Sequence, residues 1–141
     1  MLILDTSGLL AALDDDDQRS HAAAKQVVAN YDGLLLLSPF ILAKLDYLLA
    51  TRVGWVAECA LLGEVGRGTY RLEPFSEDDV AEAMGVIERH ADPVIGLADA
   101  SNVVLANRHG TLDILTLDER HFRVLRGPQD RPFRLLPADA G

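Results

Sequence analysis

The chain has 141 residues, of which 49% are hydrophobic and 25% are charged. A chain of this length and composition can bury a sizeable core, which favours one globular domain and excludes a largely disordered protein. Its 22 acidic and 13 basic residues give a formal net charge of −9. This charge argues against nucleic-acid binding through a broad positive surface, but it leaves open an enzyme that acts on an anion through metal ions.

Cysteine usage and hydrophobicity indicate the compartment. The single cysteine, Cys59, cannot form a disulfide within the chain or a cysteine metal cluster, and we expect it to pack against other side chains. No apolar run approaches the roughly 18 residues of a membrane-spanning helix. The stretch from Met1 to Asp5 does not resemble a signal peptide, because it lacks basic residues and contains a carboxylate. We therefore expect a cytoplasmic protein without a membrane segment.

Short apolar runs alternate with helical patterns along the chain, beginning with an expected strand at residues 2–4. A helix capped by Thr6–Ser7 follows to Leu13, and the acidic run from Asp14 to Asp17 is expected to loop between helices. The later segments, in chain order, are a helix at 18–29, a strand at 34–37, helices at 39–51 and 55–65, a strand at 69–73, helices at 77–90 and 95–109, and strands at 113–117 and 133–136.

Three helix ends carry recognisable capping residues. Ser38 followed by Pro39 is typical of an N-cap and a first helical position. Ser76 with Asp79 three residues later resembles a capping box, and Gly110 suits the left-handed position that ends a helix. Strands that alternate with helices in this way predict an α/β fold, with a mainly parallel sheet covered on both faces. In such sheets, functional sites form at the carboxyl ends of the strands.

Two aspartates directly follow expected strands. Asp5 follows the first strand and Asp118 follows the apolar run that ends at Leu117, so both carboxylates should emerge at one edge of the sheet. The alternative is that each aspartate only caps the next helix. Thr6 and Ser7 weaken that alternative for Asp5, because either hydroxyl could provide the cap.

A third aspartate, Asp99, lies in the first turns of the helix expected at 95–109. Its neighbours Ala98 and Ala100 are small, which lets a ligand approach, although a solvated carboxylate near a helix N-terminus is the simpler alternative. Asn102, three residues later, could orient Asp99 by hydrogen bonding. Converging aspartates repel one another unless a cation neutralises them, and oxygen ligands alone favour Mg²⁺ or Mn²⁺.

The three aspartates lie in segments of distinctive order and spacing. The segments are Leu4-Asp5-Thr6-Ser7, the stretch from Ile95 to Ala106, and Leu115-Thr116-Leu117-Asp118-Glu119-Arg120-His121-Phe122. Together they resemble the PIN domain, specifically the VapC toxins of bacterial toxin–antitoxin pairs. The resemblance implies a single PIN-like α/β/α sandwich over residues 1–137, followed by a short tail at 138–141.

The resemblance also implies an activity. Proteins of this family are Mg²⁺- or Mn²⁺-dependent endoribonucleases that cleave RNA of the transfer or ribosomal class. Asp5, Asp99 and Asp118 match the metal-binding aspartates, and Thr6 and Thr116 match positions whose hydroxyls could orient them. The implied partners are a VapB-like antitoxin and a second copy of the chain, in a homodimer and a toxin–antitoxin hetero-oligomer.

The sequence departs from the family at Lys44, where the resemblance predicts a glutamate. Asp46 is a poor substitute, because two residues along a helix turn the side chain by about 200°. An ammonium group beside three aspartates would compete with a metal ion, so we expect weak Mg²⁺ binding and impaired RNA cleavage. The alternative for Lys44 is a lysine that extends to water from the edge of an apolar stripe.

Other polar residues give weaker signals. The four histidines have no paired metal-ligand spacing, and surface or helix-end positions are expected for all of them, with His109 interacting with a helix dipole: His21, His90, His109 and His121. Arg120, Arg123 and Arg126 could contact phosphate or an acidic partner. Two rival functions remain open. One is a phosphotransfer protein, disfavoured by Ser7 at the place of a second aspartate, and the other is an inactive PIN-like module that retains antitoxin binding and regulation.

Overall fold

The computed structural model describes residues 1–90 and 94–141, and within them five strands form one sheet. Their order across the sheet is β3-β2-β1-β4-β5, and every neighbouring pair is parallel, so β1 is central. This arrangement confirms the predicted parallel α/β sheet. The strands are β1 (Leu2–Leu4), β2 (Leu35–Leu37), β3 (Arg71–Leu72), β4 (Asp113–Leu115) and β5 (Arg134–Leu136).

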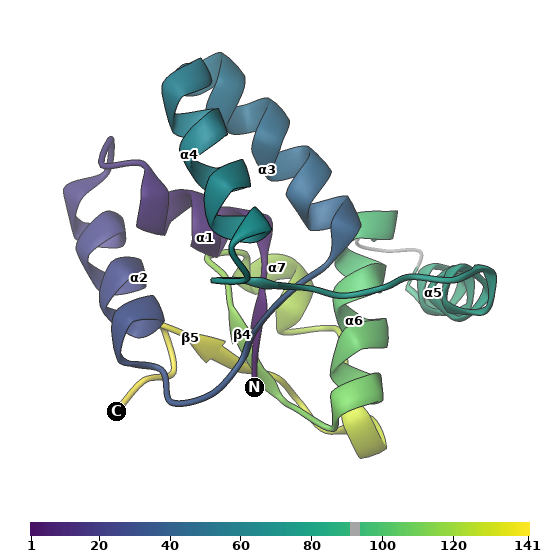
Figure 1. Cartoon of the computed structure of the whole chain (residues 1–141). Helices are drawn as coiled ribbons and strands as arrows, with labels where there is room; N and C mark the ends of the chain where they lie inside the picture. Colours follow the sequence, from purple (N-terminus) through teal and green to yellow (C-terminus); the bar gives the residue numbers. More distant parts are fainter. Residues whose placement is uncertain (91–93) are drawn as a thin grey trace.

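Helices cover both faces of the sheet, as expected for an α/β/α sandwich (Figure 1). Side chains alternate across the central strand: Ile3 packs into one apolar cluster, whereas Leu2 and Leu4 pack into a second cluster on the opposite face. The Ile3 cluster includes residues of α5 (Glu77–Arg89) and α6 (Leu97–His109). The other cluster includes residues of α1 (Thr6–Leu13), α2 (Gln18–Asn30), α3 (Pro39–Arg52) and α4 (Trp55–Gly66).

Neighbouring strands end at nearly the same level in the sheet, so the residues that follow them lie along one edge. In the register of the sheet, Leu4 lies beside Leu115, and Leu37 lies beside Leu72. The residue that follows each of four strands is polar and buried, with 5% exposure or less; these residues are Asp5, Ser38, Glu73 and Thr116. The carboxyl edge of the sheet is therefore an internal polar row between two apolar layers.

The predicted helix ends are largely confirmed. The Ser38 hydroxyl accepts a hydrogen bond from the Phe40 N–H at 3.1 Å, Ser76 and Asp79 form a reciprocal capping box, and Gly110 adopts φ 65°. The prediction of a Thr6–Ser7 cap is wrong, because α1 already begins at Thr6. Asp5 takes the N-cap position without a capping hydrogen bond, since its carboxylate is directed to other partners.

Three further features differ from the sequence-based expectations. Cys59 is exposed on α4, so the predicted packing role is wrong: the apolar face of this helix is carried by Leu61 instead. Two short elements were not predicted, α7 (Glu119–Phe122) and the 3-10 turn η1 (Pro128–Asp130). Both are too short to show helical periodicity in a sequence. Among the residues described, no helix has the length and apolar character needed to cross a membrane.

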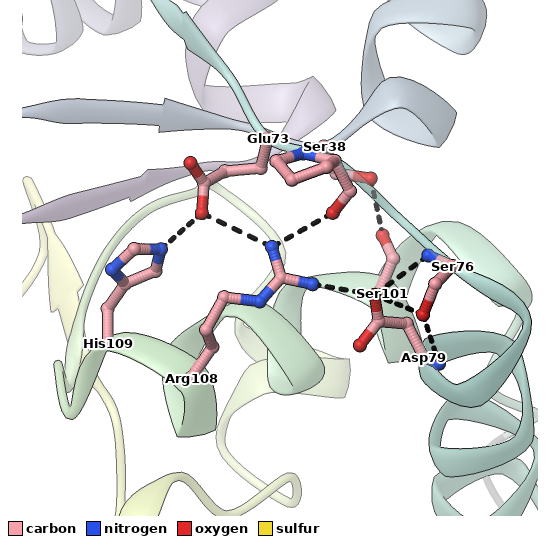
Figure 2. A network of polar contacts seen from close by, with 8 residues as sticks. Ser38, Glu73, Ser76, Asp79, Ser101, Arg108 and His109 are labelled. Atoms are coloured by element: carbon pink, nitrogen blue, oxygen red, sulfur yellow. Dashed lines mark hydrogen bonds and ion pairs between the residues drawn. The ribbon is translucent and has the colours of Figure 1, made fainter.

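An internal ion network joins the segment after β3 to the end of α6 (Figure 2). The buried Glu73 carboxylate contacts His109 and lies 3.3 Å from the Arg108 guanidinium. Arg108 also donates to the Pro74 carbonyl at 2.9 Å and to Asp79 at 2.8 Å. His109 was expected to interact with a helix dipole, and its observed contact is this carboxylate. The network fastens the start of α5 to α6.

Gly8 allows α1 to approach β4 closely. A Cβ atom at this position would lie 2.4 Å from the Leu115 carbonyl oxygen, which is backbone and cannot move independently. We expect Gly8→Ala to lower the free energy of unfolding by about 1–3 kcal/mol, because the helix must shift away from the sheet. Chemical denaturation measures this loss.

Gly63→Ala is the matched control in α4. Its added Cβ would meet only the flexible end of the Arg67 side chain, at 3.4 Å. This substitution should leave stability unchanged or raise it by about 0.5–1 kcal/mol through the reduced entropy of the unfolded chain. Equal losses in both variants would contradict the close-packing explanation.

Candidate metal centre at the carboxyl edge of the sheet

Asp5 is held at the end of the central strand by neutral hydrogen-bond donors. The Thr116 hydroxyl donates to its Oδ2 at 2.7 Å, and the Ser7 hydroxyl donates to the same atom at 3.2 Å. The Asn102 side-chain amide donates to Oδ1 at 3.3 Å. Both carboxylate oxygens are thus oriented, while the side chain is 4% exposed.

Burial raises the pKa of Asp5 from its ordinary value of 3.8 to about 6. The hydrogen bond from Thr116 opposes this effect, because it stabilises the ionised form. The negative charge of Asp99 raises the pKa further. Asp5 and Asp99 therefore lie close enough to interact, although α6 begins more than ninety residues after β1.

Asp99 and Asp118 converge on the ring of His121. The Nδ1 atom of this ring lies 3.0 Å from Asp99 Oδ2 and 2.9 Å from Asp118 Oδ2. The other oxygen of Asp118 accepts a hydrogen bond from the backbone N–H of His121 at 3.0 Å. Asp118 therefore caps α7 through one carboxylate oxygen, while its other oxygen faces the ring of His121.

The charges around Asp99 act on its pKa in opposite directions. Partial burial raises the pKa and is the largest effect, and the negative charge of Asp118 raises it further. The charges of His121 and Lys44 lower it. Asp99 therefore lies among groups of both signs, and the net effect is a raised pKa.

These residues line one cleft of about 250 Å³ at the carboxyl edge of the sheet. Its lining comes from the ends of β1 and β4 and from α1, α3, α6 and α7. The structure thus brings together all four residues that the sequence singled out. The lining residues are Asp5, Thr6, Ser7, Leu10, Lys44, Leu48, Arg52, Asp99, Asp118 and His121.

Two basic residues of α3 border this cleft, and an acidic one does not. Lys44 and Arg52 are separated by eight residues, or about two helical turns, and lie on the same side of the helix. Asp46 instead lines a separate groove with Glu58 and Leu62. This placement confirms that Asp46 points away from the site, as the helical geometry predicts.

The contacts of three polar residues change or add to the sequence-based expectations. The expectation that Asn102 orients Asp99 is wrong, because its side-chain amide donates to Asp5 at the end of β1. His121 lies at a helix end, as expected, and it also lines the cleft. Arg123 was considered for contact with phosphate or an acidic partner, and Glu119 and Asp139 engage its guanidinium in ion pairs. Arg120 and Arg126 are exposed.

Known proteins similar to this chain belong to the family that the fold and the cleft indicate. The PIN domain family model matches residues 2–127. Ribonuclease VapC26 of Mycobacterium tuberculosis (strain ATCC 25618 / H37Rv) is 42% identical over 136 residues, which are 96% of this chain and the full length of that protein. The crystal structure of Mycobacterium tuberculosis VapC20, described as a Sarcin-Ricin loop cleaving toxin, has a TM-score of 0.77 at 24% identity and covers 84% of this chain and 90% of that one.

The chain belongs to the PIN domain family. The match spans strands β1 to β4, the helices α1 to α7 and the cleft with its acidic residues, and it ends before β5. Within the family the chain is VapC-like, because it is similar to Ribonuclease VapC26 over nearly its whole length. The similarity to VapC20 shows only that the two chains share a fold.

The raised pKa of Asp5 predicts how stability depends on pH in the metal-free protein. Between pH 4 and pH 6 the folded chain retains a proton on Asp5 that the unfolded chain has lost, so stability falls as pH rises through this range. The expected contribution is about 2–3 kcal/mol. Asp5→Asn should remove most of this fall and leave the smaller part due to the raised pKa of Asp99, as measured by denaturant midpoints from pH 3.5 to 8.

Asp139→Asn is the control, because its shift has the opposite sign. Arg123 lowers the pKa of Asp139 to about 2, so the stabilisation from this residue is present above pH 4 and is lost on acidification. The Asp139 variant should leave the fall between pH 4 and pH 6 in place. An unchanged fall in the Asp5 variant would show that another group causes it.

Proposed function

We propose that this chain cleaves RNA phosphodiester bonds with the help of Mg²⁺ or Mn²⁺ held by Asp5, Asp99 and Asp118. The observation that carries the proposal is the meeting of these carboxylates in one cleft, at the end of the central strand. They come from three distant parts of the chain, and their mutual repulsion has to be offset by positive charge.

The side chains present fit a divalent cation. Ligand atoms of Asp99, Asp118 and His121 all lie within 4.8 Å of one another, and Asp5 adds a buried carboxylate on the same cleft. Thr6 is 5% exposed and lines the cleft, and its hydroxyl has no hydrogen-bond partner in the part of the chain that the structure describes. When bound, a cation of this class supplies an activated water and stabilises negative charge on a phosphate.

The protein contributes orientation and charge around this centre. Thr116 and Asn102 fix the Asp5 carboxylate, and the backbone of His121 fixes Asp118. Lys44 and Arg52 border the cleft with positive charge on its α3 side. An RNA phosphate can approach this side in spite of the acidic net charge, because local cations act over a few ångströms and the distant carboxylates are screened by salt.

Lys44 impairs the site, according to this proposal. Its ammonium group lowers the pKa of Asp99 and lines the same cleft, so it offers Asp99 a positive partner without a metal ion. A cation that binds must overcome this competition, and the family's glutamate would instead have added a negative charge. We therefore expect weak Mg²⁺ binding and slow cleavage in this chain.

The proposed partners are a VapB-like antitoxin and a second copy of this chain, with transfer or ribosomal RNA as substrate class and the cytoplasm as location. Support comes from α3 and α4, which expose large apolar side chains that the core does not use. Leu45 and Leu49 of α3 are buried in the core. Tyr47, Val53, Trp55, Val56 and Leu62 are exposed.

A second candidate is an inactive PIN-like module that retains antitoxin binding and regulation. Lys44 is the observation that favours it, because a site with a resident ammonium could have lost metal binding altogether. Restored cleavage after a change at this one position would support the nuclease proposal over the inactive module.

We expect Lys44→Glu to tighten Mg²⁺ binding by about ten- to a hundredfold and to raise RNA cleavage by a similar factor, because the change replaces a repelling charge with an attracting one. Calorimetric titration with Mg²⁺ and gel analysis of a mixed RNA substrate measure the two effects. Addition of a chelator should abolish the cleavage.

Lys25→Glu is the matched control. Lys25 is the other lysine of the chain, is exposed on α2, and lies outside the cleft lining, so the substitution makes the same change in net charge. Its effect on Mg²⁺ binding should be less than about twofold. Equal behaviour of the unaltered chain and the Lys44 variant would overturn the proposed impairment.

A further inference from the structure

We propose that His121 is a metal ligand through its Nδ1 atom, so that the centre selects Mn²⁺ and other transition-metal ions over Mg²⁺. The inference rests on the proposed function and extends it, because an aspartate-only site uses oxygen ligands. Its basis is the position of the imidazole ring, which lies between two carboxylates at the mouth of the cleft.

The contacts of Nδ1 have the spacing of neighbouring metal ligands. Two ligands about 2.1 Å from one ion and at right angles lie about 3.0 Å apart. The Nδ1 atom lies 3.0 Å from Asp99 Oδ2 and 2.9 Å from Asp118 Oδ2. The three atoms, one nitrogen and two oxygens, all lie within 4.8 Å of one another, so a single ion could bind all three.

Hydrogen bonding alone does not account for this placement. Nδ1 is buried as an atom and lies at ion-pair distance from two carboxylate oxygens, without a well-aligned hydrogen bond to either of them. A proton on Nδ1 would point along the ring plane and could serve only one acceptor well. A deprotonated Nδ1 beside two carboxylate oxygens would complete a set of three ligands.

A second, independent observation also points to a ligand in this cleft. Thr6 is 95% buried and lines the cleft beside Asp5, and its hydroxyl has no hydrogen-bond partner among residues 1–90 and 94–141. Buried hydroxyls normally find partners in the protein or in bound water. An ion with its water ligands would give this hydroxyl the partner that the protein does not provide.

Nitrogen ligation changes which ions bind well. Mg²⁺ prefers oxygen ligands and retains its waters, whereas imidazole favours transition metals, whose affinity rises from Mn²⁺ through Co²⁺ to Ni²⁺. The backbone of His121 also donates to Asp118 Oδ1, which leaves Oδ2 of that carboxylate turned toward the ring. One residue thus positions a neighbouring ligand and provides another.

The test uses the full chain and its Lys44→Glu variant, with Mn²⁺ and Mg²⁺ as probes. Affinities come from calorimetry, and nitrogen coupling to bound Mn²⁺ comes from pulsed EPR spectroscopy. We expect coupling to one histidine nitrogen, with the ¹⁴N pattern replaced by a ¹⁵N pattern when the histidines are ¹⁵N-labelled. This labelling requires no substitution and so does not depend on how a variant folds.

His121→Asn should remove the nitrogen coupling and weaken Mn²⁺ binding by about tenfold, with a change of less than about threefold for Mg²⁺. His21→Asn is the control, since its ring contacts the Ala11 carbonyl on the α1–α2 side of the molecule, and its spectrum should match that of the unaltered chain. Retained coupling in the His121 variant would overturn the inference.

The outcomes separate this inference from the proposed function. Mn²⁺ that binds without nitrogen coupling, in both the unaltered chain and the Lys44 variant, would overturn His121 as a ligand and leave the carboxylate centre intact. Failure of both chains to bind either ion would overturn the inference and the proposed metal centre together.

Discussion

Asp5 directly follows a strand whose three residues are all fully buried, so the chain places this carboxylate inside the protein and away from water. Burial of a charge is unfavourable, and the raised pKa of Asp5 expresses that cost. The parallel sheet increases this cost, because residues that follow neighbouring strands meet at the same edge and bring further charges close to Asp5. The site depends on this constraint: charge collects at the end of β1 because of the topology.

The surrounding residues reduce the cost without removing it. Thr116 and Asn102 donate neutral hydrogen bonds to Asp5, which stabilise the ionised form but add no positive charge. Positive charge comes from the opposite side of the cleft, from Lys44 and Arg52, and from His121 when it is protonated. Neutral donors thus hold the Asp5 carboxylate in a fixed orientation without neutralising its charge. A carboxylate held in this way can bind a cation without first rearranging.

Much of this arrangement follows from sequence rules that act locally. Apolar runs followed by an aspartate predict the strands and place Asp5 and Asp118 at one edge, and the capping residues Ser38 and Ser76 predict where helices begin. These rules work because strand burial and helix capping depend on a few adjacent residues. The same holds for Asp46, whose direction follows from helical rotation alone.

His121, Asn102 and Cys59 show where local rules stop. His121 reaches the cleft through a four-residue helix, which is too short to leave a periodic pattern, although Asp118 at its N-cap and the spacing of three residues were visible. Asn102 could be assigned to a helix but not to a partner, because its contact spans 97 residues of sequence. Cys59 was assigned by residue-type preference, which tertiary packing overrides.

A second buried carboxylate at the same edge of the sheet differs from Asp5 in its partners. Glu73 also follows a strand and is equally buried, but Arg71, Arg108 and His109 surround it. The protein provides the positive partners of Glu73 itself, and these contacts tie β3 and α5 to α6 (Figure 2). Asp5 receives neutral donors and faces a cleft. A buried carboxylate paired with the protein's own cations holds the fold together, whereas one left without them can bind an ion from solution.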